Sequence, residues 1–391
     1  MAASPDDATP YGPALRRHFL LEDGVVFLNH GSFGATPRAV LAAQDDWRRR
    51  MEAQPVRFMS RELPRLLRHA AADLAAFLGV AGDDLVFVDN ATTGVNAVLR
   101  SLDLAPGDEV LATDHGYPAV RNAARYVCGR VGARLVEARL PFPATGAAAI
   151  EAEVAAALTP RTRLAIFDAV TSATAIALPV AALARRCRAA GVRVLIDAAH
   201  APGMLDLDLP GLGADWVAGN AHKWLFAPKG CGFLWADRAA QGELHPTVVS
   251  HGLGKGFTAE FDWTGTRDPS AWLAVGAALD FYRAMGDGNL RARNHALACD
   301  AAALLAAAWG TEAAAPPAML GSMAAVRLPG AAEATPAGAK AAHDLLWDEH
   351  RIETPVHAVA GALWLRVSAQ IYNDIAEYRG LAEAVLGAAP A

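Results

Sequence analysis

Residues 192 to 200 read Val-Arg-Val-Leu-Ile-Asp-Ala-Ala-His, an apolar run that is closed by an acid. The first five residues are mostly aliphatic and β-branched, which predicts a buried β-strand over residues 192–196. Asp197 follows the strand directly, and burying an acid there costs several kcal/mol unless it has a partner. We therefore expect this strand to lie inside a sheet and Asp197 to face a site at its end.

Similar short strands alternate with Ala-, Leu- and Arg-rich helical stretches along most of the chain. This alternation is typical of an α/β fold with a mostly parallel sheet and helices on both faces. The predicted helices are 66–78, 93–102, 119–131, 148–158 and 180–190. The seven predicted strands are 85–88, 109–112, 135–138, 164–167, 192–196, 216–218 and 232–235.

A long helix predicted over residues 270–284 marks a change of pattern, because Ala-rich helices and only a few strands follow it. With 391 residues the chain suits two domains. We predict a large domain at residues 29–275 and a smaller C-terminal α/β domain at residues 276–391. Residues 1–28 are predicted to pack on the small domain.

Composition restricts the partners and the compartment. A net charge of −6 without a dense basic stripe argues against nucleic acid binding. The start of the chain lacks an apolar signal, and the most apolar stretch, 164–184, is interrupted by Asp168 and Pro179, so we predict no membrane span. Four scattered cysteines without a CxxC pair indicate a reduced, cytoplasmic protein with buried free thiols.

Lys223 lies in Asn-Ala-His-Lys-Trp at residues 220–224, after the strand predicted at 216–218. Burial and nearby cations favour the neutral amine, which forms a Schiff base with an aldehyde. Pyridoxal 5'-phosphate (PLP) needs such an amine for its aldehyde and a buried carboxylate for its pyridine nitrogen. Lys223 and Asp197 therefore predict a PLP enzyme that acts on an amino acid. Lys229, in a Pro-Lys-Gly turn, is the competing lysine.

Other polar residues follow strands, where open α/β sheets bind their ligands. Thr92 and Thr93 open a predicted helix whose N-terminus could hold a phosphate, although Thr92 could also simply cap it. Tyr117 could stack on a pyridine ring or belong to an ordinary loop, and Ser172 could bond the cofactor or the substrate. His200 could touch the cofactor. With Asp197 it could also ligate a metal, but no further ligand at suitable spacing supports that, so we predict no metal site.

Seven motifs, in the same order over nearly the whole chain, resemble the class V aminotransferase group of fold-type I PLP enzymes. Within this group the chain resembles the isopenicillin N epimerase-like branch, which is related to cysteine desulfurases and lyases. The motifs are NHGSFG at 29–34, NATTGVN at 90–96, DHGY at 114–117, DAAHAPG at 197–203, GNAHKW at 219–224, WTGTRD at 263–268 and LRVSAQIYN at 365–373.

The resemblance implies a role for each matching residue. Lys223 would form the Schiff base, Asp197 would contact the pyridine nitrogen, and His200 would lie near the phenolic oxygen. Arg366 would bind the substrate α-carboxylate, with Asn29 and His30 as further substrate-binding candidates. The phosphate would be held by Thr92, Thr93, Asn220 and His222, with Tyr117 stacked on the ring and Thr266 reaching across from a neighbouring subunit of a homodimer.

Several reactions fit these residues, with Lys223 as the proton carrier. Epimerisation or racemisation at the α-carbon is the first expectation, and it needs an acid on the second face, for which His30, His115 and Tyr117 are candidates. A C–S β-lyase acting on a cysteine derivative and an aminotransferase are the alternatives. A cysteine desulfurase is disfavoured, because residues 351–366 contain no cysteine. Outside enzymes, the alternative is a non-catalytic PLP-binding regulatory protein.

Overall fold

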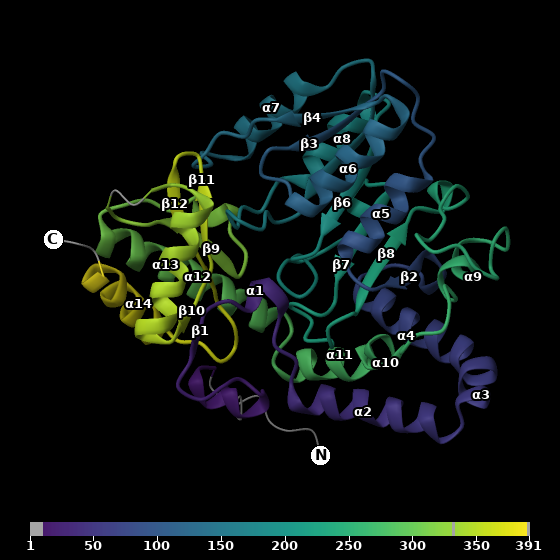
Figure 1. The fold of residues 1–391 in the computed structure, drawn as a ribbon, viewed down its shortest axis with the longest axis horizontal. Helices are drawn as coiled ribbons and strands as arrows, with labels where there is room; N and C mark the ends of the chain where they lie inside the picture. Colours follow the sequence, from purple (N-terminus) through teal and green to yellow (C-terminus); the bar gives the residue numbers. More distant parts are fainter. Residues whose placement is uncertain (1–10, 331–332, 389–391) are drawn as a thin grey trace.

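The structure is a computed structural model that describes residues 11–330 and 333–388 (Figure 1). Its centre is a seven-stranded sheet in the order β2-β8-β7-β6-β5-β3-β4. Within this sheet only β8 runs against its neighbours, β2 and β7, so the predicted mostly parallel α/β fold is confirmed. The strands are β2 (Leu85–Val88), β3 (Glu109–Thr113), β4 (Arg134–Ala138), β5 (Thr162–Asp168), β6 (Arg193–Ala198), β7 (Trp216–Asn220) and β8 (Gly232–Ala236).

Helices cover both faces of this sheet (Figure 1). Side chains of β5 alternate between two buried clusters, with Leu164 and Ile166 in one and Ala165 and Phe167 in the other. This alternation follows from the two-residue repeat of a strand. The first cluster includes residues of α5 (Ala91–Ser101), α6 (Pro118–Val131) and α9 (Phe257–Phe261), and the second includes residues of α4 (Leu63–Phe77), α7 (Ala147–Ala157) and α8 (Val180–Ala189).

The helix predicted over residues 270–284 is interrupted, which corrects that prediction. The chain forms α10 (Ser270–Leu273) and α11 (Val275–Ala284), separated by Ala274. Trp272 in α10 donates its indole N–H to the carbonyls of Val88 and Gly230, so α10 is tied to the end of the sheet. An apolar repeat continues across the break, which is why the sequence pattern does not reveal it.

A smaller unit follows, built on a three-stranded antiparallel sheet in the order β11-β12-β9 (Figure 1). Contacts with β9 and β12 place the 22-residue helix α12 against this sheet. The elements are α12 (Gly288–Trp309), β9 (Met323–Arg327), α13 (Pro336–His350), β10 (Ile352–Glu353), β11 (Val356–Val359), β12 (Ala362–Ser368) and α14 (Ile375–Ala388).

The described part of the N-terminal segment reaches this smaller unit. The backbone N–H of Gly12 donates to the carbonyl of Ile371, and β1 (Val26–Phe27) pairs in parallel with β10. The domain limits at residues 28 and 275 stay predictions. The remaining helices are α1 (His30–Phe33), α2 (Arg38–Ala53) and α3 (Pro55–Arg57), the π-helical turn Phe58–Glu62, and the 3₁₀ turns Pro13–His18, Gly82–Asp84, Pro210–Leu212, Arg238–Ala240 and Pro317–Met319.

Across residues 11–330 and 333–388, none of the helices combines the length and the apolar character that crossing a bilayer requires. The carboxyl ends of the parallel strands β2, β3, β5, β6 and β7 share one edge of the sheet. The residues that follow these strands therefore meet there, as expected for a ligand site in an open α/β sheet.

Candidate active site

A cavity of about 560 Å³ lies at this edge, and we call it the active-site cavity. It brings together most of the residues that the sequence predicts for the site. Its lining is Ser32, Phe33, Asp89, Asn90, Ala91, Thr92, Thr93, Tyr117, Asp168, Val170, Ser172, Asp197, Ala199, His200, Asn220, His222, Lys223, Lys229 and Gly230.

Asp197 lies in β6 and is 3% exposed. One carboxylate oxygen accepts a hydrogen bond from the backbone N–H of Ala199 at 2.9 Å. Burial raises the pKa of Asp197, and the carboxylate forms no ion pair within the described part of the chain. A buried carboxylate that faces a cavity in this way is stabilised by a cationic ligand group.

Asp168 is a second buried acid of the cavity, and its role is not apparent from the sequence. It lies opposite Asp197 in the register of β5 and β6, and it accepts a hydrogen bond from the Tyr117 N–H at 3.1 Å. Burial, and then the charge of Asp197, raise the pKa of Asp168 well above its usual value. Asp168 also closes a buried apolar strand, so the signal that identified Asp197 was present here too.

Lys223 lies in the turn after β7, with its Nζ 3.2 Å from His200 Nε2. The indole N–H of Trp224 donates to His200 Nδ1 at 3.4 Å, and burial lowers the pKa of His200, so the ring is neutral and carries its proton on Nε2. That N–H can then donate to an unprotonated Lys223 amine. Burial, and then the charge of Arg366, lower the pKa of Lys223 to about 8.

Lys229 lines the same cavity, so its position also allows it to be the lysine that forms the Schiff base. Its Nζ donates to the hydroxyl of Thr36 at 3.3 Å, and burial lowers its pKa. Lys255 lies in an exposed turn and Lys340 lies on α13, and neither lines this cavity. The two cavity lysines differ in surroundings, since only Lys223 contacts the His200 and Trp224 pair.

Helix α5 points its N-terminus into the cavity. Its cap is Asn90, whose side chain accepts from the Thr93 N–H at 2.9 Å, so the simple capping role considered for Thr92 is wrong. Asn220 accepts from the Ala91 N–H at 2.8 Å. The Thr92 N–H has no acceptor within the described residues, so it remains available, with the threonine hydroxyls, to an anion at the helix terminus.

His222 lines the cavity beside this helix terminus. Its Nδ1 donates to the carbonyl of Cys231 at 3.1 Å, and burial lowers the pKa of His222 to about 4. The other ring nitrogen can therefore meet a ligand. A bound phosphate would favour the protonated ring, because opposite charges at close range raise a histidine pKa.

Arg366 in β12 is 2% exposed and does not itself line the active-site cavity, so its role in binding the α-carboxylate stays a prediction. Its guanidinium donates to the carbonyl of Ser172, to Asn29 Oδ1 at 3.2 Å and to the Ser32 hydroxyl at 2.9 Å. Arg366 Nε has no partner, and no carboxylate pairs with this cation within the described residues. Burial lowers its pKa to about 10. Ser32 and Ser172, which line the cavity, connect it to this buried charge.

A sequence model of the family described as "Aminotransferase class-V" matches residues 26–338. The chain belongs to the class V aminotransferase family. It is 37% identical to isopenicillin N epimerase from Streptomyces clavuligerus over 95% of this chain and 96% of that protein. It is 36% identical to putative L-cysteine desulfhydrase 1 from Oryza sativa subsp. japonica over 93% and 83% of the two chains. The solved structure of the cystine C-S lyase C-DES with cysteine persulfide shares the fold, with a TM-score of 0.81, 24% identity and coverage of 94% and 99%.

This class V protein is a PLP-dependent enzyme, and the cavity fits that cofactor. Lys223 offers an amine and Asp197 offers a buried carboxylate without an ion pair. The N-terminus of α5 offers an anion site on the same cavity. These three groups match the aldehyde, the pyridine nitrogen and the phosphate of PLP. No cluster of three metal-ligating side chains occurs within residues 11–330 and 333–388.

Two residues expected to bind substrate lie behind the cavity of this class V enzyme. His30 is fully buried, with Nδ1 2.7 Å from the Tyr372 hydroxyl and Nε2 3.1 Å from the Lys223 carbonyl. Asn29 accepts from Arg366 and donates to Glu353. His30 therefore positions the backbone of Lys223, and Asn29 positions the guanidinium of Arg366. Ser32, three residues after Asn29, lines the cavity itself.

Thr266 is exposed and does not line the cavity of its own chain. Its neighbour Arg267 forms an ion pair with Asp89, which does line the cavity. The loop that carries Thr266 is thereby tied to the rim next to the N-terminus of α5.

Proposed function

We propose that this class V enzyme removes the α-proton of an amino acid and returns it, as an epimerase or racemase does. The observation that carries the proposal is the shared cavity of Lys223 and Asp197, in which the lysine has a lowered pKa. The relatedness to isopenicillin N epimerases, at 37 and 38% identity over 95% of this chain, supports the same class of reaction.

In this proposal Lys223 would hold PLP through its side-chain amine, and the same neutral amine would move the α-proton of the substrate. Asp197 would keep the pyridine nitrogen of PLP in its protonated form. Bound PLP supplies the electron sink that stabilises the negative charge left on the α-carbon. With PLP bound, His200 would donate its Nε2 proton toward the phenolic oxygen, and Thr92, Thr93, Asn220 and His222 would hold the phosphate.

We further propose that the substrate α-carboxylate binds where Ser32 and Ser172 meet Arg366. The support is electrostatic, since a buried guanidinium without an ion pair is stabilised by an anionic ligand. The planar guanidinium suits a carboxylate in two-point contact. Asn29 orients Arg366, and His30 orients the backbone of Lys223.

Return of the proton to the second face needs a second acid, and Tyr117 is our choice. Its ring lines the active-site cavity and is 40% exposed. The other two candidates are engaged elsewhere, because His30 is bonded on both ring nitrogens and His115 contacts the Thr174 hydroxyl at 3.0 Å outside this cavity. Tyr117 can also stack on the cofactor ring.

A C–S lyase acting on a cysteine derivative is the second candidate. Several L-cysteine desulfhydrases are 32–36% identical to this chain over at least 92% of it. Such a reaction needs little beyond Lys223 as the proton carrier. The segment before Arg366 is occupied by β10, β11 and β12 and contains no cysteine, which keeps a desulfurase disfavoured. An aminotransferase remains a third alternative, whereas the enzyme family argues against a purely regulatory role.

We also propose a homodimer in which Thr266 completes the phosphate site of the neighbouring subunit. The exposed position of Thr266 and the Arg267–Asp89 pair at the cavity rim support this arrangement. Exposed apolar side chains, Val248, Val249 and Leu253, lie on the same stretch of chain. A cytoplasmic location stays a prediction from composition.

The decisive experiment follows the α-proton of a panel of L-amino acids and cysteine conjugates in deuterated water. An epimerase exchanges the proton and yields both configurations, which NMR and chiral chromatography measure. A lyase yields pyruvate and sulfide, and an aminotransferase yields a keto acid. Absence of α-proton exchange with every member of the panel would contradict the proposal.

A further inference from the structure

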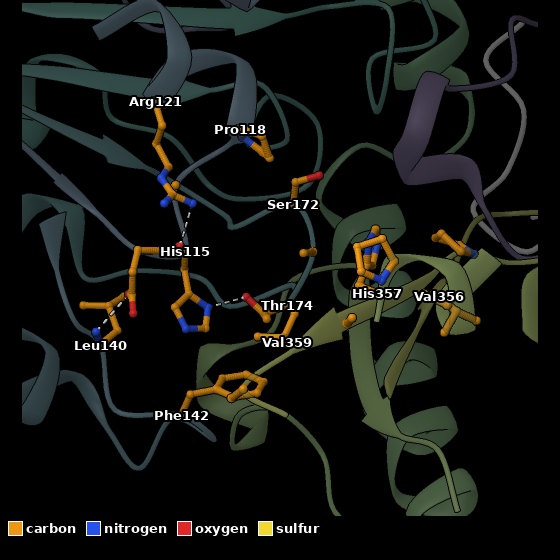
Figure 2. A pocket seen from close by; sticks show the side chains of 18 of the residues that line it. His115, Pro118, Arg121, Leu140, Phe142, Ser172, Thr174, Val356, His357 and Val359 are labelled. Atoms are coloured by element: carbon orange, nitrogen blue, oxygen red, sulfur yellow. Dashed lines mark hydrogen bonds between the residues drawn. The ribbon is translucent and has the colours of Figure 1, made fainter. Parts of the chain in front are cut away.

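A chain of side-chain contacts connects Arg366 to a second cavity. This cavity, of about 910 Å³, lies between the large unit and the smaller one, and we call it the interdomain cavity (Figure 2). Ser172 lines both cavities and accepts a hydrogen bond from Arg366. On the side of the smaller unit, the wall of the interdomain cavity includes His343 of α13. His343 Nε2 lies 3.4 Å from Glu353 Oε2, so the contacts continue from this wall to Glu353 in β10.

The backbone around Glu353 contacts the segments that carry Asn29 and Arg366. β10 pairs in parallel with β1, and the N–H of Leu28 donates to the Glu353 carbonyl at 3.0 Å, so Asn29 follows directly after this contact. On the other side, the Thr354 hydroxyl donates to the Arg366 carbonyl at 2.9 Å. Glu353 is thereby placed between the two segments, within reach of the Asn29 side chain.

The Asn29 side chain joins Glu353 to Arg366, and it is 8% exposed. Its amide N–H donates to Glu353 Oε1 at 2.8 Å, and its amide oxygen accepts from Arg366 Nη2 at 3.2 Å. A carboxylate only accepts hydrogen bonds and a guanidinium only donates them, whereas an amide has one end of each kind. Glu353 therefore fixes the orientation of the Asn29 amide that presents its oxygen to Arg366. The reverse orientation would set two donors against each other.

The same amide oxygen orients Ser32. The Ser32 hydroxyl donates to Asn29 Oδ1 at 2.6 Å, which leaves its lone pairs for Arg366 Nη2 at 2.9 Å. Three neutral groups thus hold the guanidinium, and they belong to Asn29, Ser32 and Ser172. No carboxylate lies within 4.0 Å of the guanidinium nitrogens in the described part of the chain, since Asn29 separates Glu353 from Arg366. The guanidinium is held in place without being neutralised.

We propose that Glu353 is a positioning residue for the binding of the substrate α-carboxylate. It orients Arg366 through Asn29, and the neutral amide between them keeps the negative charge of Glu353 from pairing with the guanidinium. A carboxylate in direct contact with Arg366 would form a buried ion pair and compete with the substrate. The inference rests on the proposed function, in which the α-carboxylate binds at Arg366.

Two substitutions separate the hydrogen-bond acceptor of Glu353 from its charge. Glu353→Gln removes the charge but keeps an acceptor oxygen at the same distance from the backbone, so the Asn29 amide should keep its orientation. Glu353→Met has a side chain of similar length and offers only a weak sulfur acceptor, so the Asn29 amide is free to reverse. The proposal therefore expects a defect in Glu353→Met that Glu353→Gln does not show.

The test measures how tightly the PLP-loaded enzyme binds L-2-aminobutyrate and 1-aminopropane, which differ only in the α-carboxylate. Dissociation constants come from the rapid absorbance change of the cofactor on mixing. Glu353→Met should weaken the binding of L-2-aminobutyrate about fivefold, the size of one hydrogen bond, and leave 1-aminopropane within about twofold. Glu353→Gln should stay within about twofold for both compounds. Glu349→Met, at an exposed position of α13, removes the same charge and is the matched control without an effect.

The Arg366→Ala background shows whether Glu353 acts through Arg366. There, adding Glu353→Met should change the affinity for L-2-aminobutyrate by less than about twofold, because the contact that it supports is already lost. Asn29→Leu breaks the same connection without altering Glu353 and should reproduce the selective loss. Equal weakening of both compounds in Glu353→Met, an equal loss in Glu353→Gln, or a fivefold effect that persists in Arg366→Ala would overturn this inference alone. If Arg366→Ala leaves the preference for L-2-aminobutyrate over 1-aminopropane unaltered, the proposed α-carboxylate site fails, and this inference fails with it.

Discussion

The two cavities that meet at Ser172 are built in different ways. The active-site cavity lies at the strand ends of a single sheet, and its lysine, acids and helix terminus follow strands that the sequence predicts. The interdomain cavity is assembled from loops and the start of α6 in the large unit together with α13 and β11 of the smaller one. We infer that the active-site cavity carries the chemistry and that residues next to the interdomain cavity position the substrate. Substitutions in the active-site cavity should therefore change kcat, and substitutions of residues next to the interdomain cavity should change KM.

The largest expected effect is the difference between substituting Lys223 and substituting Lys229, the two lysines of the active-site cavity. Lys223→Ala should lower α-proton exchange by about 10³- to 10⁴-fold, because a positioned proton carrier is lost. It should also abolish reducible attachment of PLP, which mass spectrometry after borohydride treatment measures. Lys229→Ala is the matched control and should keep the attachment. Loss of attachment in Lys229→Ala alone would transfer the role to that residue.

Substitutions of the two buried acids should lower kcat to different extents, and this difference should be smaller than that between the two lysines. Asp197→Asn should retain PLP but lower kcat by about 10²- to 10³-fold, since a neutral partner no longer keeps the pyridine nitrogen protonated. Asp168→Asn resembles the protonated acid that its raised pKa favours, so kcat should fall less than about tenfold. Steady-state kinetics and the absorbance spectrum of each variant measure this contrast. Equal losses in the two variants would show that the acids act as one unit.

Arg366 contacts Ser172, which lines both cavities, and its substitution should mainly affect substrate binding. Arg366→Ala should raise KM about 10- to 100-fold for amino acids, because a charge-assisted contact with the α-carboxylate is lost. Arg366→Lys keeps the charge without the planar two-point contact. Its KM should therefore lie between that of the unaltered enzyme and that of Arg366→Ala. The measurement is KM and kcat for each variant. A KM that stays unaltered in Arg366→Ala would place the α-carboxylate elsewhere.

The smallest effect is the dependence of PLP attachment on pH. With a pKa of about 8, Lys223 in the protein without PLP carries a neutral amine in about a tenth of molecules at pH 7 and about nine tenths at pH 9. The attachment rate should therefore rise about tenfold between these values and level off above them. Stopped-flow absorbance after mixing with PLP measures the rate. A rate that still rises steeply at pH 10 would indicate a lysine with an ordinary pKa.

Much of the fold and of the active-site cavity was predictable from the sequence. The apolar runs at residues 85–88, 164–167 and 192–196 are local patterns, and each corresponds to a strand of the large sheet. Residues that directly follow such strands must meet at one sheet edge, which is why Asp197 and Lys223 could be predicted to lie together. The interruption at Ala274 was not predicted, because the apolar repeat continues across it.

The sequence by itself determined the alternation of strands and helices, the small number of lysines that could form the Schiff base, and the acid that follows a buried strand. Hydrophobic periodicity and residue type suffice for these features, because they act over a few neighbouring residues. Only the tertiary structure decided that Arg366 lies behind Ser32 and Ser172, and that Arg139 lines a cavity with α13. Those relations join segments that are more than 190 residues apart, and no local pattern encodes how two packed units shape the space between them.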